Sequence, residues 1–159
     1  MAETPTMRRQ LIELVRGGGA HLDFDAAIAD LPAKLRGVKP QGLPHTPWRL
    51  VEHMRIAQHD ILEFCRSKDH GSPDWPKGYW PEGDAPSNDR AWDQNVEAFR
   101  DDLQAMQDIV ADESNDLFAP IPWGDGQTIF REAMLLADHN SYHLGQLITV
   151  RRVLGAWGG

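Results

Sequence analysis

Apolar residues recur every three or four positions in several stretches of the chain, which is the spacing of one buried helix face. The first such stretch predicts a helix over residues 6–15, ended by the glycine run 17–19. A short helix is expected next, with Asp23 as its N-cap and a boundary or bend at Pro32. Its apolar stripe consists of Phe24, Ala27, Ile28 and Leu31.

A long helix is predicted from Thr46, a capping residue followed by Pro47, to about Lys68. Its inward stripe is apolar except at one position and consists of Leu50, His53, Met54, Ala57, Ile61 and Phe64. A lone histidine on such a face is usually a hydrogen-bonded core residue. His53 therefore becomes a candidate ligand only in company with other inward-facing histidines.

Two further long helices follow. Ser87 is expected to cap the first, whose apolar residues repeat at intervals of 4, 3, 4, 3 and 4 and are Trp92, Val96, Phe99, Leu103, Met106 and Val110. This heptad seam is typical of helices packed in a bundle, and no His, Asp or Glu interrupts it. Thr128 is expected to cap the last helix, which can run to Leu154. Apolar residues cover so broad an arc of this helix that it should lie at the centre of a bundle or against a second subunit.

The connections rich in proline and glycine are predicted to be loops and occupy residues 39–45, 69–86 and 119–127. The second of these loops is long and carries Trp75, Tyr79 and Trp80. A long loop in a compact domain is usually functional or mobile. Its aromatic side chains either line a functional site or cover one end of the core, and the pattern leaves both possibilities open.

Long amphipathic helices without a strand pattern or an internal repeat predict an all-α fold, an antiparallel up-and-down four-helix bundle. A chain of 159 residues fits a single domain over residues 1–159.

Composition narrows the classes of function. The net charge of −8 and the lack of a Lys/Arg cluster argue against nucleic-acid binding. No apolar run reaches the ~20 residues that span a bilayer, and the chain start lacks the apolar part of a signal peptide. The cytoplasm is therefore the expected location, and no membrane partner is expected. Cys65 is the only cysteine, which rules out an intrachain disulfide and indicates a reducing compartment.

Candidate chemistry centres on His139 and His143, four residues apart in the apolar last helix. Residues i and i+4 lie on the same helix face. The same flank carries Ile129, Leu136, Leu147, Val150 and Leu154, so both imidazoles should point towards the core. An unpaired buried polar group costs about 1–3 kcal/mol, and two stacked imidazoles are hard to satisfy by hydrogen bonds alone. Metal ligation is the alternative, and a third inward ligand would strengthen it.

The chain resembles the DinB-like (DinB/YfiT) superfamily in two runs, Thr46 to Met54 and Asp138 to Gln146, and in the order of helices and loops over most of its length. This resemblance implies a four-helix bundle that holds a divalent metal ion through three histidines, one from the second helix and two from an HxxxH motif in the last. Carried over residue by residue, these ligands are His53, His139 and His143. Dimers are common in the superfamily, and with the broad apolar arc of the last helix this predicts a homodimer.

Three neutral imidazoles suit Zn²⁺ or Ni²⁺ and leave at least one coordination position for water or substrate. A structural zinc site would normally close with a fourth side chain, but Cys65 stands twelve residues, about 18 Å of helix, beyond His53. Gln146 and Glu132 are candidates to orient an imidazole, or could equally face solvent. The remaining histidines are expected at the surface, namely His21, His45, His59 and His70.

Residue types exclude several other chemistries. The spacing of His139 and His143 matches that of zinc proteases, but Asn140 stands where their general-base glutamate would be. Di-iron bundles need Glu-x-x-His pairs, which the sequence lacks. It also lacks a phosphate-binding glycine loop and a recognisable nucleophile motif.

Two classes of function remain. Some members of the resembling superfamily are thiol-dependent S-transferases or isomerases, which implies a metal site that activates a low-molecular-weight thiol for attack on an electrophilic small molecule. Hydrolysis by metal-activated water is the nearest variant. The aromatic loop from Trp75 to Trp80 would then form one wall of the substrate pocket. The alternative is a non-catalytic metal-binding or stress-response module in which the ion pins two helices together.

Overall fold

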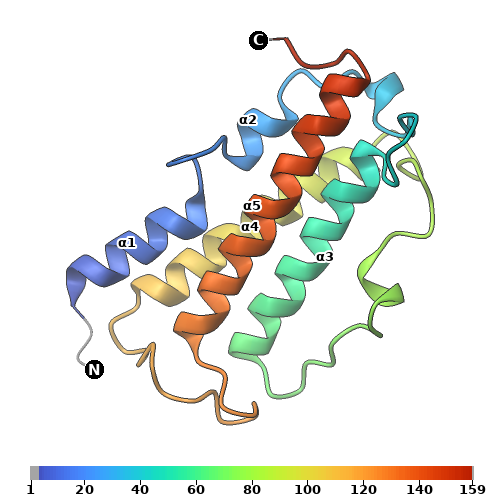
Figure 1. Ribbon diagram of the computed structural model, residues 1–159. Helices are drawn as coiled ribbons and strands as arrows, with labels where there is room; N and C mark the ends of the chain where they lie inside the picture. The colour runs from blue at the N-terminus through green and yellow to red at the C-terminus, as the bar shows by residue number, and fades with distance from the viewer. Residues whose placement is uncertain (1–3, 159) are drawn as a thin grey trace.

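The computed structural model describes residues 4–158, which form an all-α fold (Figure 1). Its α-helices are α1 (Pro5–Arg16), α2 (Phe24–Ile28), α3 (Pro47–Arg66), α4 (Ala91–Ala111) and α5 (Ile129–Val153), and its short 3₁₀ helices are η1 (Ala33–Leu35) and η2 (Lys77–Tyr79). Within residues 4–158, β-structure is limited to an isolated bridge between Pro120 and Thr128. The predicted helical bundle is thus confirmed. In this described part of the chain, no helix is long and apolar enough to cross a membrane.

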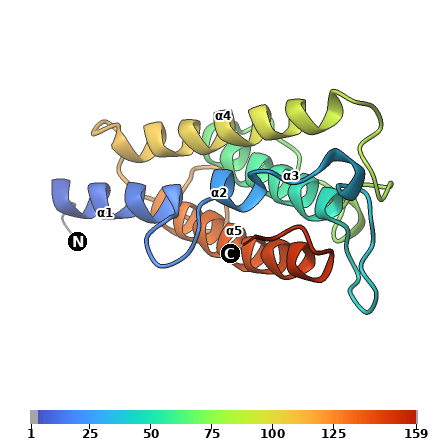
Figure 2. The same cartoon turned by 90° about the horizontal axis from the view of Figure 1, so that it is seen from above.

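Four long helices make up the bundle, and each packs mainly against two others. Both α3 and α1 contact α4 and α5. Figures 1 and 2 show α1 and α5 running in one direction and α3 and α4 in the other, so that α3 and α5 are antiparallel neighbours. The long segment 67–90 produces this order, because it returns the chain to the end of the bundle at which α3 began.

Helix starts follow the capping residues of the sequence with one exception. Side-chain oxygens accept hydrogen bonds from first-turn N–H groups of α1, α2, α3 and α5 at Thr4, Asp23, Thr46 and Thr128. The prediction of Ser87 as the cap of α4 is wrong. Asn88 Oδ1 accepts instead, from the N–H groups of Arg90 and Ala91 at 3.0 and 3.1 Å, because α4 begins only at Ala91 and Asn88 is the nearer residue to its start.

One helix ends earlier than its apolar spacing suggests. α2 ends at Ile28 because Ala29, with a ψ of 137°, has left the helical conformation, whereas α3 ends at Arg66, close to the predicted end at about Lys68. The glycine run ends α1 as predicted, since Gly17 adopts a φ of 76°, a left-handed conformation that favours glycine.

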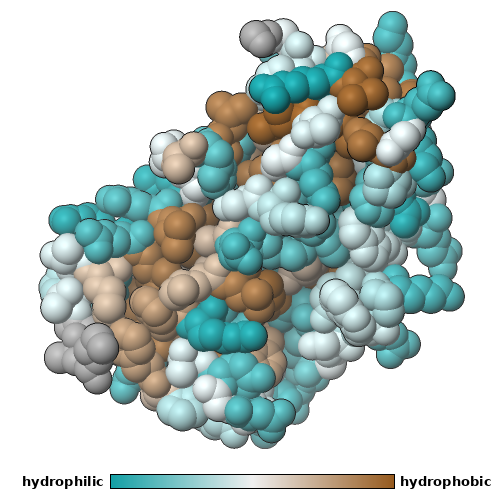
Figure 3. Space-filling model, in the orientation of Figure 1, coloured by the Kyte–Doolittle hydropathy of each residue, from teal (hydrophilic) through white to brown (hydrophobic). Residues whose placement is uncertain are grey.

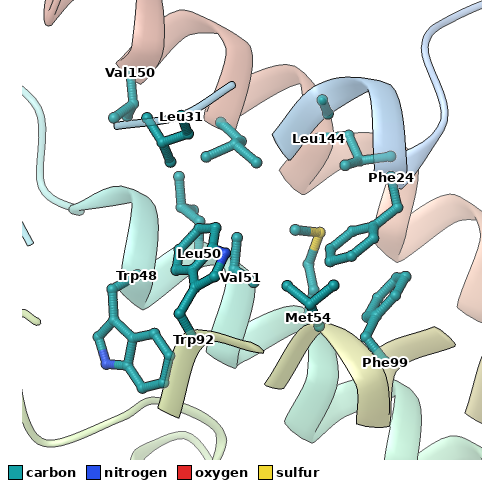
Figure 4. Packing of buried hydrophobic residues seen from close by; sticks show 13 residues of the cluster. Phe24, Leu31, Trp48, Leu50, Val51, Met54, Trp92, Phe99, Leu144 and Val150 are labelled. Atoms are coloured by element: carbon teal, nitrogen blue, oxygen red, sulfur yellow. The ribbon is translucent and has the colours of Figure 1, made fainter. Parts of the chain in front are cut away.

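Two apolar clusters form the core at opposite ends of the bundle. One cluster packs the first half of α3 against the first half of α4 and the second half of α5. Figure 4 shows its centre around Met54, where the rings of Phe24 and Phe99 stack with centroids 3.8 Å apart. The other cluster packs the opposite halves of the same helices against α1. Between the two clusters, α5 presents His139, Asn140 and His143 to α3.

Candidate metal centre

Packing of α3 against α5 brings the three predicted ligands together. The Nε2 atom of His53 on α3 lies 3.0 Å from Nε2 of His143 and 3.0 Å from Nε2 of His139, which project from successive turns of α5. Each residue offers one ligand atom, and these atoms lie within 4.8 Å of one another. His53 and His143 are buried and His139 is half-buried. The group therefore could hold a metal ion in the interior of the bundle.

Hydrogen bonds fix the tautomers of two of these imidazoles. His53 Nδ1 lies 2.7 Å from the backbone oxygen of Tyr79, which can only accept, so Nδ1 carries the proton. His143 Nδ1 lies 2.8 Å from the side-chain oxygen of Gln146 and donates to it in the same way. The other nitrogen of a neutral imidazole is an acceptor. Consequently the Nε2 atoms of His53 and His143 face each other at 3.0 Å as two lone pairs, which need a cation or a proton between them.

Burial keeps these imidazoles neutral. It lowers the pKa of His53 to about 4, an effect that the hydrogen bond to Tyr79 opposes and the neighbouring His143 reinforces. Burial, with His143 and His53 adding to it, also lowers the pKa of His139 to about 4. The pKa of His143 is lowered by burial as well. A shared proton is therefore unfavourable at neutral pH, and the facing lone pairs fit a metal ion instead.

The spacing and type of the ligands also suit a metal ion. Zn–N bonds of ~2.0–2.1 Å place neighbouring ligand nitrogens roughly 3.0–3.4 Å apart. Two of the nitrogen pairs are separated by 3.0 Å. The group contains histidines alone, and imidazole is a preferred ligand of zinc, nickel and copper.

The segment between α3 and α4 covers one face of His53. The Trp80 ring stacks on the His53 ring with centroids 3.8 Å apart and an interplanar angle of 2°. His45 also stacks on Trp80, with centroids 4.2 Å apart. Of the other aromatic residues expected at the site, Tyr79 supplies its backbone oxygen. Trp75 is 81% exposed, and its ring centroid lies 5.5 Å from that of Tyr79.

Hydrogen bonds to α3 anchor this covering segment. The Tyr79 hydroxyl donates to Asp60 Oδ2 at 2.6 Å, and His70 Nε2 lies 2.8 Å from Asp60 Oδ1. Burial, together with the hydrogen bond and charge of Asp60, raises the pKa of Tyr79 to about 12, so its hydroxyl remains a donor. The anchor holds the Tyr79 backbone and the Trp80 ring against His53.

Two predicted neighbours of the site behave differently. Gln146 contacts His143, as predicted. Glu132 is not an orienting partner and does not face solvent. It is buried near Cys65 and accepts a hydrogen bond from the adjacent Arg131. Cys65 is buried, and burial with the nearby Glu132 charge raises its pKa to about 12, so it remains a thiol.

Surface placement, expected for the four other histidines, is correct for His21 and His59 and wrong for His45 and His70, which are half-buried. Both are covered through contacts with distant parts of the chain, Trp80 for His45 and Asp60 for His70. The one local signal for His45 was its place just before the cap of α3, which keeps it close to the helix that carries His53.

Two hollows open beside the histidine group and share His45 as a wall. The charged groove has a volume of about 880 Å³, and its walls include Arg49, Asp74, Lys77, Trp80 and Glu82. The apolar groove has a volume of about 290 Å³ and lies between residues 43–45 and α5; its other walls are Leu50, Tyr142, Gly145, Gln146, Thr149 and Val150.

Fold and site together define a class of protein, an all-α bundle whose interior holds three converging neutral histidines. A family model described as the DinB superfamily matches residues 20–147, and the chain belongs to this superfamily. The buried histidine group fits a metal-binding member of it. Comparison with curated proteins and with solved structures found no match.

Proposed function

We propose that His53, His139 and His143 hold one divalent metal ion, Zn²⁺ or Ni²⁺, and that the site activates a low-molecular-weight thiol. One observation carries the proposal: the lone pairs of His53 and His143 face each other at 3.0 Å in a group that burial keeps neutral. Within residues 4–158, the group consists of three imidazoles and no fourth protein ligand, which is the pattern of catalytic zinc sites that keep a position open for an exogenous molecule.

A thiol suits this site better than water. A bound divalent cation lowers the pKa of a coordinating thiol until it ionises. In zinc sites with the same histidine spacing, a glutamate assists attack by water, whereas Asn140 stands at that position here. The thiol must come from outside, since Cys65 is buried and its pKa is raised to about 12. The cytoplasm, which keeps thiols reduced, would supply it.

The proposed transfer of the thiol sulfur to an electrophile needs no oxidant or reductant. The thiol proton is released to solvent, the sulfur lone pair forms a bond to an electrophilic carbon, and the leaving group departs with the electron pair of the broken bond. The chain contributes positioning. Tyr79 and Gln146 orient two imidazoles through their Nδ1 atoms, and Trp80 keeps water from one face of His53.

A spectroscopic titration tests thiol activation. Protein loaded with Co²⁺ is titrated with low-molecular-weight thiols and followed for a thiolate-to-metal charge-transfer band. The band is expected in the wild type and in Cys65→Ala, which removes the only protein thiol. It should be lost in His139→Ala, because that variant lacks one of the three ligands.

The competing function is a non-catalytic metal-binding or stress-response module, in which the ion pins α3 to α5. Two results together would favour this module and contradict thiol activation. These are the absence of a band with every thiol tested and a large loss of thermal stability on chelation.

We also propose that the protein is a homodimer. Leu14 on α1 and Met134 and Leu135 on α5 are 53%, 44% and 37% exposed. Figure 3 shows apolar surface gathered over α1 and the adjoining part of α5, and exposed apolar patches often mark protein contacts. Light scattering should give about twice the chain mass of 17.9 kDa, and Leu135→Glu should reduce it to that of one chain. A single-chain mass for the wild type at micromolar concentration would contradict the dimer.

A further inference from the structure

The apolar groove has the character of a binding site for an uncharged group. Leu43, Pro44, Leu50 and Val150 supply most of its apolar wall, and no Lys, Arg, Asp or Glu is among its lining residues. The charged groove beside it, by contrast, presents two cations and two anions. A charged ligand would find no ion-pair partner in the apolar groove. An alkyl or aryl group would be stabilised there, because binding removes its apolar surface from water.

Gly145 keeps this groove open. It lies inside α5 and lines the groove, and a Cβ added there would meet no atom within 4 Å. Glycine lowers the stability of a helix interior relative to alanine. Close helix packing, the usual reason for such a glycine, does not apply at this position. The remaining reason for a glycine at position 145 is the open space above it, which any larger side chain would fill.

The groove adjoins the histidine group on two sides, through residues that line the groove and contact the histidines. Gln146 lines the groove and accepts the hydrogen bond from His143 Nδ1 at 2.8 Å. Tyr142 also lines it, with its ring centroid 4.9 Å from that of His143. On the opposite wall His45 stacks on Trp80, which stacks on His53. The groove is therefore close enough to the three histidines to be considered as a place for part of a molecule that reacts there.

We propose that the apolar groove is the subsite for the uncharged alkyl or aryl group of the electrophilic substrate, and that Gly145 is the specificity-determining position. The groove volume of about 290 Å³ corresponds to roughly ten water-sized groups, which suits a phenyl ring or a short alkyl chain. The assignment of the ligand as a substrate rests on the proposed function. The binding of an apolar group in the groove does not.

Neutral n-alkanols from butanol to octanol test the groove without any thiol chemistry. Binding to the metal-loaded protein is followed by amide chemical shifts of residues 142–150. Each added methylene should tighten binding by up to about fourfold until the groove is full. Gly145→Leu should weaken binding at least tenfold, and Thr149→Leu, a second change in the groove wall, should act in the same direction.

Gly19→Leu is the matched control, because an added Cβ at Gly19 also meets no atom within 4 Å and this residue does not line the groove. It should bind alkanols like the wild type. Metal content should be equal in all these variants.

Three results would overturn the proposal. The first is the absence of alkanol binding to the wild type, and the second is binding that is unchanged in both groove variants. The third is that Gly145→Leu converts the dimer into single chains and that alkanols bind only to single chains. The groove would then be occupied by a second copy of the protein. If alkanols bind as expected but no thiol gives the charge-transfer band, the proposed function falls and the groove assignment stands.

Discussion

Gln58 and His53 are both buried polar residues of α3 that face α5, yet their surroundings differ. Both polar atoms of the Gln58 amide are paired, since Nε2 donates to the Phe99 backbone oxygen at 2.7 Å and Oε1 accepts from Asn140 at 2.9 Å. In His53, Nδ1 donates to the Tyr79 backbone oxygen, whereas Nε2 lies 3.0 Å from the Nε2 atoms of both His143 and His139.

The difference separates a structural polar group from a binding group. A buried polar atom left unpaired costs about 1–3 kcal/mol, so a complete set of partners explains Gln58 within the fold itself. No rearrangement of protons among the three neutral imidazoles completes the set for both His53 and His143. His139 Nε2 can donate to His53 Nε2 at 3.0 Å, but His143 Nε2 then still lacks a donor, because the Nδ1 atoms of His53 and His143 already donate. We propose a cation as the missing partner, and the contrast with Gln58 can be tested by experiment.

Metal content should show the largest effect. Protein purified without added metal is expected to contain about one divalent ion per chain by elemental analysis, and His53→Ala and His143→Ala close to none, because two imidazoles hold an ion far less tightly than three. Gln58→Leu, which changes the fully paired group, should retain the wild-type content. Equal metal in all four proteins would remove the metal site.

The pH dependence of the metal-free protein comes next in size. His53 and His139 have folded pKa values of about 4 against an ordinary value of 6.5. Between pH 4 and pH 6.5 the unfolded chain takes up protons that the folded chain does not. The free energy of unfolding should therefore be highest above pH 6.5 and fall as the pH is lowered towards 4. The slope should be roughly 1 kcal/mol per pH unit for each histidine. Urea unfolding should show a shallower slope in His53→Ala, and a flat profile in the wild type would contradict neutral burial.

Gln58→Leu should destabilise the fold by about 2 kcal/mol without affecting metal affinity, because it leaves the Asn140 amide buried without its acceptor. Urea unfolding measures the loss. Gln104→Leu is the matched control on an exposed helix position and should stay within about 0.5 kcal/mol of the wild type. A Gln58→Leu protein as stable as this control would show that the paired amide contributes nothing.

The smallest effect is expected at Gln146, which orients His143. Gln146→Leu should weaken metal binding about tenfold in a competition assay with a chelator, since the imidazole loses the acceptor that fixes its tautomer. Gln146→Glu keeps an acceptor oxygen and should restore most of the affinity. If Leu and Glu at this position bind metal equally well, the hydrogen bond has no orienting role.

Local patterns predicted the helices and the inward-facing histidines because both depend on spacing along one helix. The resemblance to the DinB-like superfamily then implied that His53, His139 and His143 form one ligand set. Thr46 and Thr128 start α3 and α5 where their hydroxyls can cap free N–H groups. The interval between His139 and His143 places both on one face whatever the rest of the chain does. The apolar stripe around His53 predicted in the same way that this residue points inward.

Only the tertiary structure decided what surrounds these ligands. His53 and His143 are 90 residues apart, and Trp80 reaches His53 through the irregular segment 67–90, whose path depends on its anchors on α3 rather than on a local period. For the same reason the placement of His45 and His70 and the opening of both grooves were not predictable. Their contacts join segments that local spacing does not relate, and packing of the whole bundle selects them.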